Sequence, residues 1–351
     1  MNITPILSRL RANRKFRARS SEIICPPEIR SEAPAIFLPD EIDRIVAVQH
    51  ETSFDNEMNR IFGGNVTHQA TVAHDIGKAL LADGVLYHSC GRVNFQSRPR
   101  RPFLSGEIAR LDRAAVVTTG VAEAYFGHWL RDSLITERLA NVLGLHAIAP
   151  DRDNWKHEDG YRAITGLRSD RYSQVLIENA VIFEDIGLNT NAITRLEWIR
   201  EKVRAQVDHA VGPRRVYLRR VGGGNGRDML NEKALNQFLI SKGFETIDPI
   251  SCSVGDIARS LSNADIVVLS EGSAHNHALL TMKRGSALVT IQPPRRFNAV
   301  VKPFFHAVGI EWAFTVGDDD GEGFSAPFGR LMRAIDLGSG PINGIPNRYR
   351  V

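Results

Sequence analysis

Apolar and polar positions follow a regular order in the second half of the chain. Short apolar runs bounded by turn residues predict buried strands, and apolar positions three and four residues apart predict helices. From about residue 210 onward the two kinds of segment alternate. Strands are expected at 214–218, 244–247, 265–269 and 286–291, and helices at 231–243, 253–261, 273–285 and 328–335.

Two of these helices carry start signals. Asn231 is a favourable N-cap residue, and Ser253 with Asp256 three residues later resembles a capping box. Strands that alternate with helices at this spacing imply right-handed crossovers and a doubly wound parallel sheet, covered on both faces. Such sheets bind ligands beyond the carboxyl ends of their strands. The loops at 221–229 and 270–276 are therefore the candidate binding loops.

The first half of the chain is less regular but contains the same mixture of elements, so the expected fold class is α/β throughout. Strands are expected at 45–48, 85–87, 114–118 and 175–183, and helices at 127–143 and 192–209. The expected organisation is a basic N-terminal tail (1–30), an N-terminal α/β domain (31–209), a C-terminal domain (210–315), and an acidic loop with a last helix and tail (316–351).

Length and composition fit an ordinary two-domain protein. The 351 residues exceed the usual span of one core. No apolar run approaches the roughly 20 residues that a membrane crossing needs, and the N-terminus lacks the apolar core of a signal peptide. We therefore expect a cytoplasmic protein. Cys25, Cys90 and Cys252 are too scattered for a zinc site, and we expect them to be reduced.

The net charge of +4 favours an anionic partner, a description that nucleotides, acidic lipids and nucleic acids all satisfy. The positive charge is densest within residues 1–20, where arginines follow apolar residues at helical spacing. This segment is either a solvated tail or a peripheral contact with an acidic membrane. The chain contains no recognisable nucleic-acid-binding module, so nucleic acid is not expected as a partner.

One predicted helix carries ionisable residues on an otherwise apolar stripe. His128, Asp132, Ile135 and Leu139 fall on one line at spacings of four, three and four. A stripe that is apolar at one end and ionisable at the other is typical of the wall of a cleft. His128 or Asp132 would there accept a proton from a hydroxyl group. The alternative is structural, with Asp132 stabilising the first helical turn and His128 half-buried and hydrogen-bonded.

Arginines bracket a glycine-rich loop after the first strand of the C-terminal domain. Arg215, Arg219 and Arg220 precede residues 222–226, and Arg227 follows them. Guanidinium groups and backbone N–H groups that converge in this way suit a diphosphate. The loop lacks the features of a Walker or dinucleotide-binding motif, and a flexible turn is the alternative.

The second candidate loop joins a strand to a helix and consists mostly of small residues. Such residues let a ligand approach the backbone, and the start of a helix favours phosphate. Metal binding is not expected, because alternate histidines on a helix point apart. The loop Glu271–Asn276 is therefore the better candidate for binding phosphate.

At these residues a family resemblance becomes visible. The stretch 125–134 contains the order His-Trp-Leu-x-Asp-x-Leu, which resembles a signature of glycosyltransferase family 61, also known as the capsular polysaccharide biosynthesis protein family. The resemblance covers roughly residues 115–295. The segments that follow the family's order and spacing are Arg215–Arg220, Arg227, Asn231–Glu232, Gly243–Phe244, Ala264–Val268 and Gly272-Ser273-x-x-Asn276.

The resemblance implies two Rossmann-like domains facing a cleft, in a GT-B-like arrangement. It implies an acceptor-side N-terminal domain, a C-terminal domain that binds a nucleotide sugar, and transfer to a polysaccharide or glycolipid with inversion at the anomeric carbon. The nucleotide sugar is then a co-substrate, and no cofactor or metal is needed. The resemblance makes Asp132 the first candidate for the base and His128 the second. The implied donor residues are Arg215, Arg219, Arg227, Asn231, Glu232, Glu271, Gly272, Ser273 and Asn276.

The chain departs from the family pattern at Glu271, where a histidine is usual. A carboxylate at this position would oppose donor phosphates. An alternative function is therefore a non-catalytic relative that binds a nucleotide or sugar and has lost the chemistry.

Overall fold

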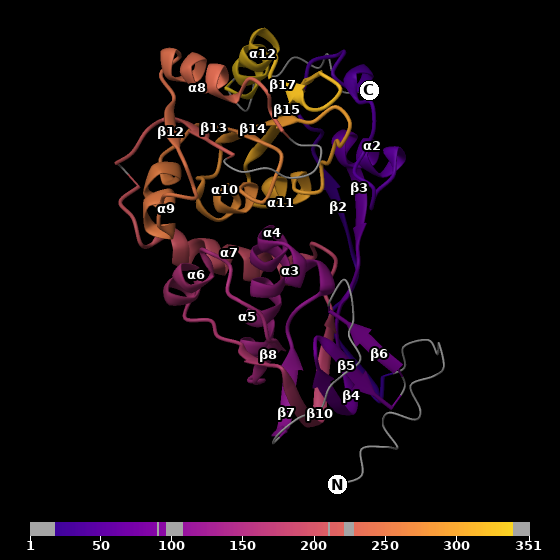
Figure 1. The fold of residues 1–351 in the computed structure, drawn as a ribbon. Coiled ribbons are helices and arrows are strands. Elements are labelled where there is room, and N and C mark those ends of the chain that lie inside the picture. The colour runs from indigo at the N-terminus through magenta and orange to yellow at the C-terminus, as the bar shows by residue number, and fades with distance from the viewer. Residues whose placement is uncertain (1–17, 90, 96–107, 210, 221–227, 340–351) are drawn as a thin grey trace. The chain divides into compact units, whose positions relative to one another are not determined.

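The structure is a computed structural model that describes residues 18–89, 91–95, 108–209, 211–220 and 228–339. These residues form two compact units, each with its own β-sheet and helices (Figure 1). Unit 1 combines the described residues up to Glu28 with Thr67–Ile199. Unit 2 combines Ile29–Val66 with the described residues from Arg200 onward. The chain thus passes between the units at three points.

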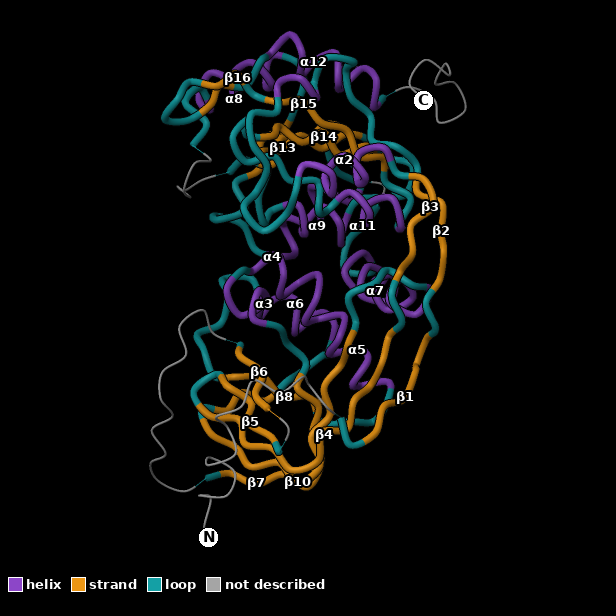
Figure 2. Tube along the Cα trace, turned by 90° about the vertical axis from the view of Figure 1, so that its right-hand side faces the viewer, coloured by secondary structure: helices purple, strands orange, loops and turns teal. Residues whose placement is uncertain are grey.

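Unit 1 contains a mixed sheet with the strand order β6-β5-β4-β10-β7-β8-β9, and β1 also pairs with β4. The pairs on the β4 side are antiparallel, whereas β10, β7, β8 and β9 run parallel. Figure 2 shows the long strands of this sheet. The strands are β1 (Ser20–Cys25), β4 (Thr71–Ala82), β5 (Val85–His88), β6 (Gly91–Asn94), β7 (Ala109–Val116), β8 (Ala147–Pro150), β9 (Asp170–Tyr172) and β10 (Gln174–Glu184).

Helical segments connect the parallel strands of unit 1. Apolar residues of β7, β8 and β10 form buried clusters, and Ala140 from the helix after β7 packs into one of them. The segment between β7 and β8 is helical for most of its length but changes its hydrogen-bonding pattern in the middle. The helical segments are α3 (Gly120–Ala124), α4 (Phe126–His128), a π-helical turn (Trp129–Ser133), α5 (Leu134–Val142), α6 (Glu158–Thr165) and α7 (Thr190–Arg204).

Unit 2 contains a parallel sheet with the strand order β12-β11-β13-β14-β15. Its central strands are buried along their whole length, as expected for a parallel sheet covered on both faces. The strands are β11 (Arg215–Leu218), β12 (Glu245–Ile247), β13 (Ile266–Ser270), β14 (Ala287–Gln292) and β15 (Glu311–Val316).

Helices lie on the two faces of this sheet (Figure 1). Leu235 and Leu239 of α8 and Leu331 and Ile335 of α12 pack into one cluster with the strands. On the other face, His275 of α10 bonds a side chain of β14 and contacts a ring of α11. The helices are α8 (Glu232–Ser241), α9 (Val254–Ser262), α10 (His275–Thr281), α11 (Lys302–Ala307) and α12 (Phe328–Gly338).

Three buried carboxylates fix residues 29–66 to the rest of unit 2. Glu41 is fully buried and accepts hydrogen bonds from Val316 N at 2.7 Å and from Thr315 Oγ1 at 2.9 Å. Glu57 accepts from a backbone amide, and Glu32 pairs with a buried lysine. A buried charge must be paired to be tolerated, so these contacts specify where the segment lies. The segment contains the end of β2 (Glu28–Glu32), a 3-10 turn (Ile42–Arg44), α2 (Phe54–Phe62) and the start of β3 (Gly64–His68), and β2 pairs with β3.

The structure confirms an α/β protein with parallel strands. The strands and helices predicted after residue 210 are present, with ends shifted by a few residues. Ser253 and Asp256 form the predicted capping box, with both reciprocal bonds. Asn231 precedes α8 as predicted, but its side chain binds the backbone of Ala326 instead of capping the helix.

Several predictions from the first half need correction. The helix expected at 127–143 is broken by the π-helical turn, and the one at 192–209 ends at Arg204. The strand expected at 45–48 is an irregular segment with one bridge, Val48 to Phe297. Residues 31–66 join the second unit instead of the first, because the buried carboxylates have their partners there. Ser20–Cys25 of the expected tail forms a strand, and residues 1–17 lie outside the described residues.

We predict that Glu41→Ala lowers the free energy of unfolding by about 3–5 kcal/mol, because it leaves the hydroxyl of Thr315 and the amide of Val316 without their acceptor and removes one partner of Arg330. Urea unfolding at neutral pH measures this loss. Asp40→Ala is the matched control, since Asp40 binds the same arginine but is 59% exposed, and we expect a clearly smaller loss. Equal losses in the two variants would contradict the anchoring role of Glu41.

Candidate functional site

In unit 1 the candidate base lies in the π-helical turn. Trp129 and Leu130 are buried and anchor the turn in the core, while His128 and Asp132 remain partly exposed, at 31% and 28% of their side chains. Arg131 lies beside them and is 5% exposed. A π-helical turn inside a helix is uncommon and is often found at functional sites. It gathers a histidine, an arginine and an aspartate on one side of the segment.

These three side chains bind one another. His128 Nδ1 lies 2.7 Å from Asp132 Oδ2, and Arg131 Nε donates to Asp132 Oδ1 at 3.2 Å. Arg131 Nη2 also lies 2.9 Å from His128 Nδ1. Nδ1 cannot donate to Asp132 and accept from Arg131 at once, so the tautomer decides between the two contacts. If Nδ1 carries the proton, it binds Asp132 and leaves Nε2 as a proton acceptor.

The environment of Asp132 keeps its carboxylate ionised. Burial raises the pKa of Asp132, but the charge of Arg131 and the hydrogen bond from His128 outweigh burial, and the net effect lowers the pKa below its ordinary value of 3.8. A carboxylate with a lowered pKa is ready to accept a hydrogen bond from a hydroxyl group, although it is a weaker base than an isolated aspartate.

The turn sits at the carboxyl ends of the parallel strands of unit 1. Thr118 follows β7, and its hydroxyl lies 3.0 Å from that of Ser133, next to Asp132 in sequence. Asp185 follows β10, accepts a hydrogen bond from Thr136 and is paired with Arg195. This edge is where ligands bind in parallel α/β sheets.

In unit 2 the order of the strands reverses between β11 and β13. The chain runs from β11 outward to β12, returns to β13 on the other side of β11, and continues to β14 and β15. The register pairs Leu218 with Leu269, so both strands end at the same level. The point of reversal is the preferred ligand site of an open parallel sheet. The two candidate loops begin here.

Two arginines follow β11 at this point. Arg220 Nη1 donates to the backbone oxygen of Glu271 at 2.8 Å and so links the ends of β11 and β13. Arg219 binds Glu232 through two bonds of 2.7 Å. The hydrogen bond to Glu232 raises the pKa of Arg219, so its guanidinium stays charged. Glu232 balances the charge of Arg219, and Arg220 provides a second guanidinium at this edge of the sheet.

Glu271 is not an isolated negative charge. Its carboxylate Oε2 lies 3.2 Å from Arg296 Nη1, and the two side chains are 11% and 23% exposed. Arg296 follows β14, the neighbour of β13. Arg296 therefore offsets the repulsion that the carboxylate of Glu271 would exert on a phosphate group.

The loop after Glu271 has a backbone that a ligand could approach closely. Gly272 has a φ of 157°, a conformation that other residues rarely adopt. His275 holds the loop through Gly272 O at 2.6 Å and Thr290 Oγ1 at 3.0 Å. Asn276 Nδ2 donates to the backbone oxygen of Ser273. The Oδ1 of Asn276 and the Oγ of Ser270 are buried and have no hydrogen-bond partner among the described residues. Buried polar atoms normally have a partner, so these two atoms are exceptions.

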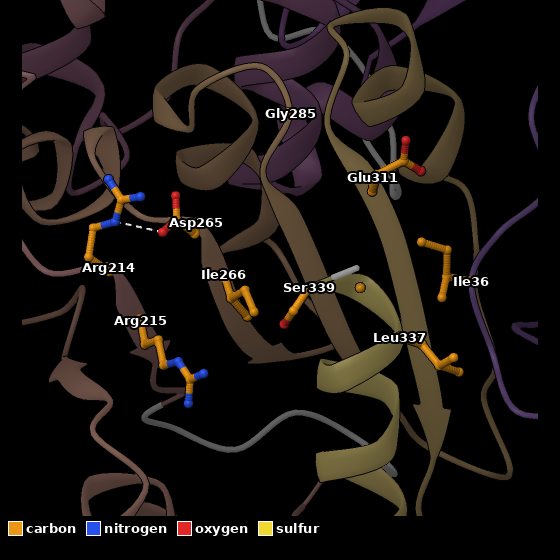
Figure 3. Close-up of a pocket in the computed structure, with 10 residues that line it drawn as sticks. Ile36, Arg214, Arg215, Asp265, Ile266, Gly285, Glu311, Leu337 and Ser339 are labelled. Carbon is orange, nitrogen blue, oxygen red and sulfur yellow. Dashed lines mark ion pairs between the residues drawn. The ribbon is translucent and has the colours of Figure 1, made fainter. Parts of the chain in front are cut away.

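Other expected donor residues lie elsewhere. Arg215 begins β11, at the opposite edge of the sheet, where its guanidinium bonds the backbone of Lys242. It lines a cavity of about 330 Å³ at the amino ends of the strands, together with Arg214 and Asp265, which form an ion pair (Figure 3). Arg227 and the glycine-rich stretch lie outside the described residues. Asn231 is occupied by the backbone of Ala326.

Arg220 belongs to the arginine run that the sequence analysis relates to a diphosphate, but it is not among the expected donor residues. Arg131 and Arg296 are absent from the sequence analysis as site residues. Arg131 stands next to Asp132, so its position in the motif is a usable signal. Arg296 has no such signal, because only the order of the strands brings it beside Glu271. Among the described residues, no group of three or more His, Cys, Asp or Glu side chains is placed to hold a metal ion.

Comparison with known proteins identifies the class. Residues 126–289 match the model of the family described as Glycosyltransferase 61, and this match supports glycosyl transfer as the activity. The resemblance found in the sequence is thereby confirmed. The match includes the π-helical turn and the loop at Glu271, but not Arg296. No curated protein matches the chain. Within the described residues, no helix has both the length and the apolar character to cross a bilayer.

The lowered pKa of Asp132 predicts a pH dependence of stability. An ionised carboxylate with a depressed pKa stabilises the folded state fully above the unfolded pKa of 3.8, and this contribution is lost as the pH falls through the lower folded value. The difference in unfolding free energy between the parent and Asp132→Asn should thus be constant above about pH 5 and shrink on acidification. Urea unfolding of the two proteins between pH 7 and 3 measures this difference. A difference that grows on acidification would contradict the assigned direction.

Proposed function

We propose that the protein is an inverting glycosyltransferase that moves a sugar from a nucleotide-sugar donor to a polysaccharide or glycolipid acceptor. The observation that best supports a donor site in unit 2 is the hydrogen bond from Arg220 to the backbone oxygen of Glu271, at the point where the strand order reverses. Parallel α/β sheets bind nucleotides at such points. The match to a glycosyltransferase family supports a nucleotide sugar as the ligand.

In this proposal, unit 2 binds the diphosphate of the donor. Arg220 supplies the main positive charge, and Arg219 supplies a second guanidinium whose position is set by Glu232. The backbone around Gly272 and Ser273 and the side chain of Asn276 complete the site. Fixed positive charge of this kind stabilises a departing diphosphate. We therefore propose that the reaction needs neither a cofactor nor a metal ion.

The turn in unit 1 supplies the base. The acceptor oxygen attacks the anomeric carbon, its proton passes to the Asp132 carboxylate, and the bond from that carbon to the diphosphate breaks. Attack and departure on opposite sides of the carbon give inversion. His128 is the second candidate, because Asp132 can hold its Nδ1–H and leave Nε2 to take the proton. We further propose a cytoplasmic enzyme, with the basic N-terminal segment as a peripheral contact to acidic membrane.

We predict that Asp132→Asn lowers the transfer rate by about 10²–10⁴-fold while leaving the dissociation constant for nucleoside diphosphate unchanged. A panel of nucleotide sugars, assayed for release of nucleoside diphosphate with and without glycan acceptors, measures the rate. Calorimetry measures binding. His128→Gln distinguishes the two candidates. A smaller loss of transfer rate than in Asp132→Asn places the base at Asp132, and an equal loss indicates that the two residues act as one unit.

Asp170→Asn is the matched control for this experiment. Asp170 also forms a 2.7 Å pair with a histidine of unit 1, His146, but both are well exposed and lie at the starts of their strands. We expect normal turnover from this variant. Normal turnover from Asp132→Asn would remove Asp132 from the mechanism. Ligand binding without turnover of any donor would favour the alternative, a non-catalytic relative that binds a nucleotide or sugar.

We predict that Arg220→Ala weakens nucleoside diphosphate binding by about 10–100-fold, the equivalent of one charge-assisted hydrogen bond. Arg214→Ala is the matched control, because Arg214 stands at the other end of the same strand and pairs with Asp265. We expect Arg214→Ala to bind within about twofold of the wild type, since an exposed ion pair contributes little. Titration calorimetry gives both values. Equal affinity in the two variants would place the donor site elsewhere.

A further inference from the structure

We infer that Arg296 is a further donor-binding residue, which contacts the diphosphate and neutralises Glu271 beside it. The inference rests on the proposed function, since it concerns the same site at the carboxyl ends of β11 and β13. It adds a residue that lies outside the segment matched by the family. It also gives Glu271 a role that is compatible with an anionic ligand.

The geometry places two guanidinium groups around one residue. Arg220 comes from the strand on one side of β13 and binds the backbone oxygen of Glu271 at 2.8 Å. Arg296 comes from the strand on the other side and lies 3.2 Å from the carboxylate of Glu271. Both contacts form at the edge where ligands bind. The two positive charges therefore converge on the site from both neighbours of β13.

The chemistry of Arg296 leaves capacity for a ligand. A guanidinium presents more N–H donors than one contact with a carboxylate oxygen uses, and its planar arrangement matches phosphate oxygens. Arg296 is 23% exposed, so its group is held but accessible. Arg220, Arg296 and Glu271 together carry one net positive charge. Without Arg296, Arg220 and Glu271 would cancel, and a diphosphate would meet no net attraction from this group.

The backbone around Arg296 is fixed. Arg296 N donates to Pro293 O at 3.2 Å, and the next residue, Phe297, is fully buried and exchanges backbone bonds with Ala47 and Gln49. The loop is therefore held by residues 29–66, which pack into unit 2. A fixed loop with one partly exposed guanidinium is what a preorganised anion site requires.

The neighbouring Arg295 provides a matched control. It stands in the same loop but forms its ion pair with Asp319, at 2.9 Å, and is 58% exposed. We expect Arg296→Ala to weaken binding of uridine, guanosine or cytidine diphosphate, whichever the wild type binds, by about tenfold or more. Arg295→Ala should bind within about twofold of the wild type. Calorimetry on the full chain measures each constant, and thermal unfolding confirms that the variants are folded.

A second pair of variants distinguishes a role of Arg296 in ligand binding from a purely structural role, in which it only holds the loop at Glu271. Arg296→Lys keeps the positive charge but loses the planar arrangement of donors, so its affinity should lie between those of the wild type and Arg296→Ala. Adding Glu271→Gln to Arg296→Ala removes the carboxylate that Arg296 no longer neutralises, so the double variant should bind more tightly than Arg296→Ala alone. A purely structural role predicts that the double variant binds no more tightly than Arg296→Ala.

The outcomes are distinct. Equal affinity of Arg296→Ala and Arg295→Ala, or a double variant as weak as Arg296→Ala, would overturn the inference and leave the proposed function standing. A folded wild type that binds none of the nucleoside diphosphates would overturn the proposed function, and this inference with it.

Discussion

The parallel pairing of β11 with β13 is the constraint on which the candidate donor site depends. The pairing sets Leu218 opposite Leu269, so Arg220 and Glu271 emerge at the same level. The order of the strands reverses between β11 and β13, and open parallel sheets bind ligands at such a point. Replacing either strand end would disturb a site formed largely by backbone groups. The order and register of the strands thus determine which backbone groups and side chains meet at the candidate site.

The segment 29–66 extends this constraint to the next strand. The amides of Val46 and Ala47 donate to Pro294 O at 2.8 and 3.0 Å, and Phe297 bonds the same segment. These bonds hold the loop after β14, which carries Arg296. Buried Glu41 fixes the segment itself at the end of β15. A stretch distant in sequence therefore determines how a positive charge is presented at the candidate site.

Local signals in the sequence predicted local structure well. Ser253 and Asp256 specified a helix start, and the short apolar runs specified the strands of unit 2, because each signal depends on residues a few positions apart. The order of the strands and the unit to which residues 29–66 belong depend on contacts across hundreds of residues, and no local pattern encodes them. The π-helical turn also escaped prediction, since the spacing of His128 and Asp132 fits an uninterrupted helix equally well.

Glu271 shows why the charge at a site cannot be judged from one position. At an effective dielectric constant of about 20, two unit charges about 5 Å apart interact by about 3 kcal/mol, enough to oppose a phosphate seriously. Arg296 contributes an opposite term of similar size at a similar distance, so the sign of the total depends on whether that arginine is present. Glu271 and Arg296 together carry no net charge, so the glutamate does not by itself make this edge of the sheet repel an anion.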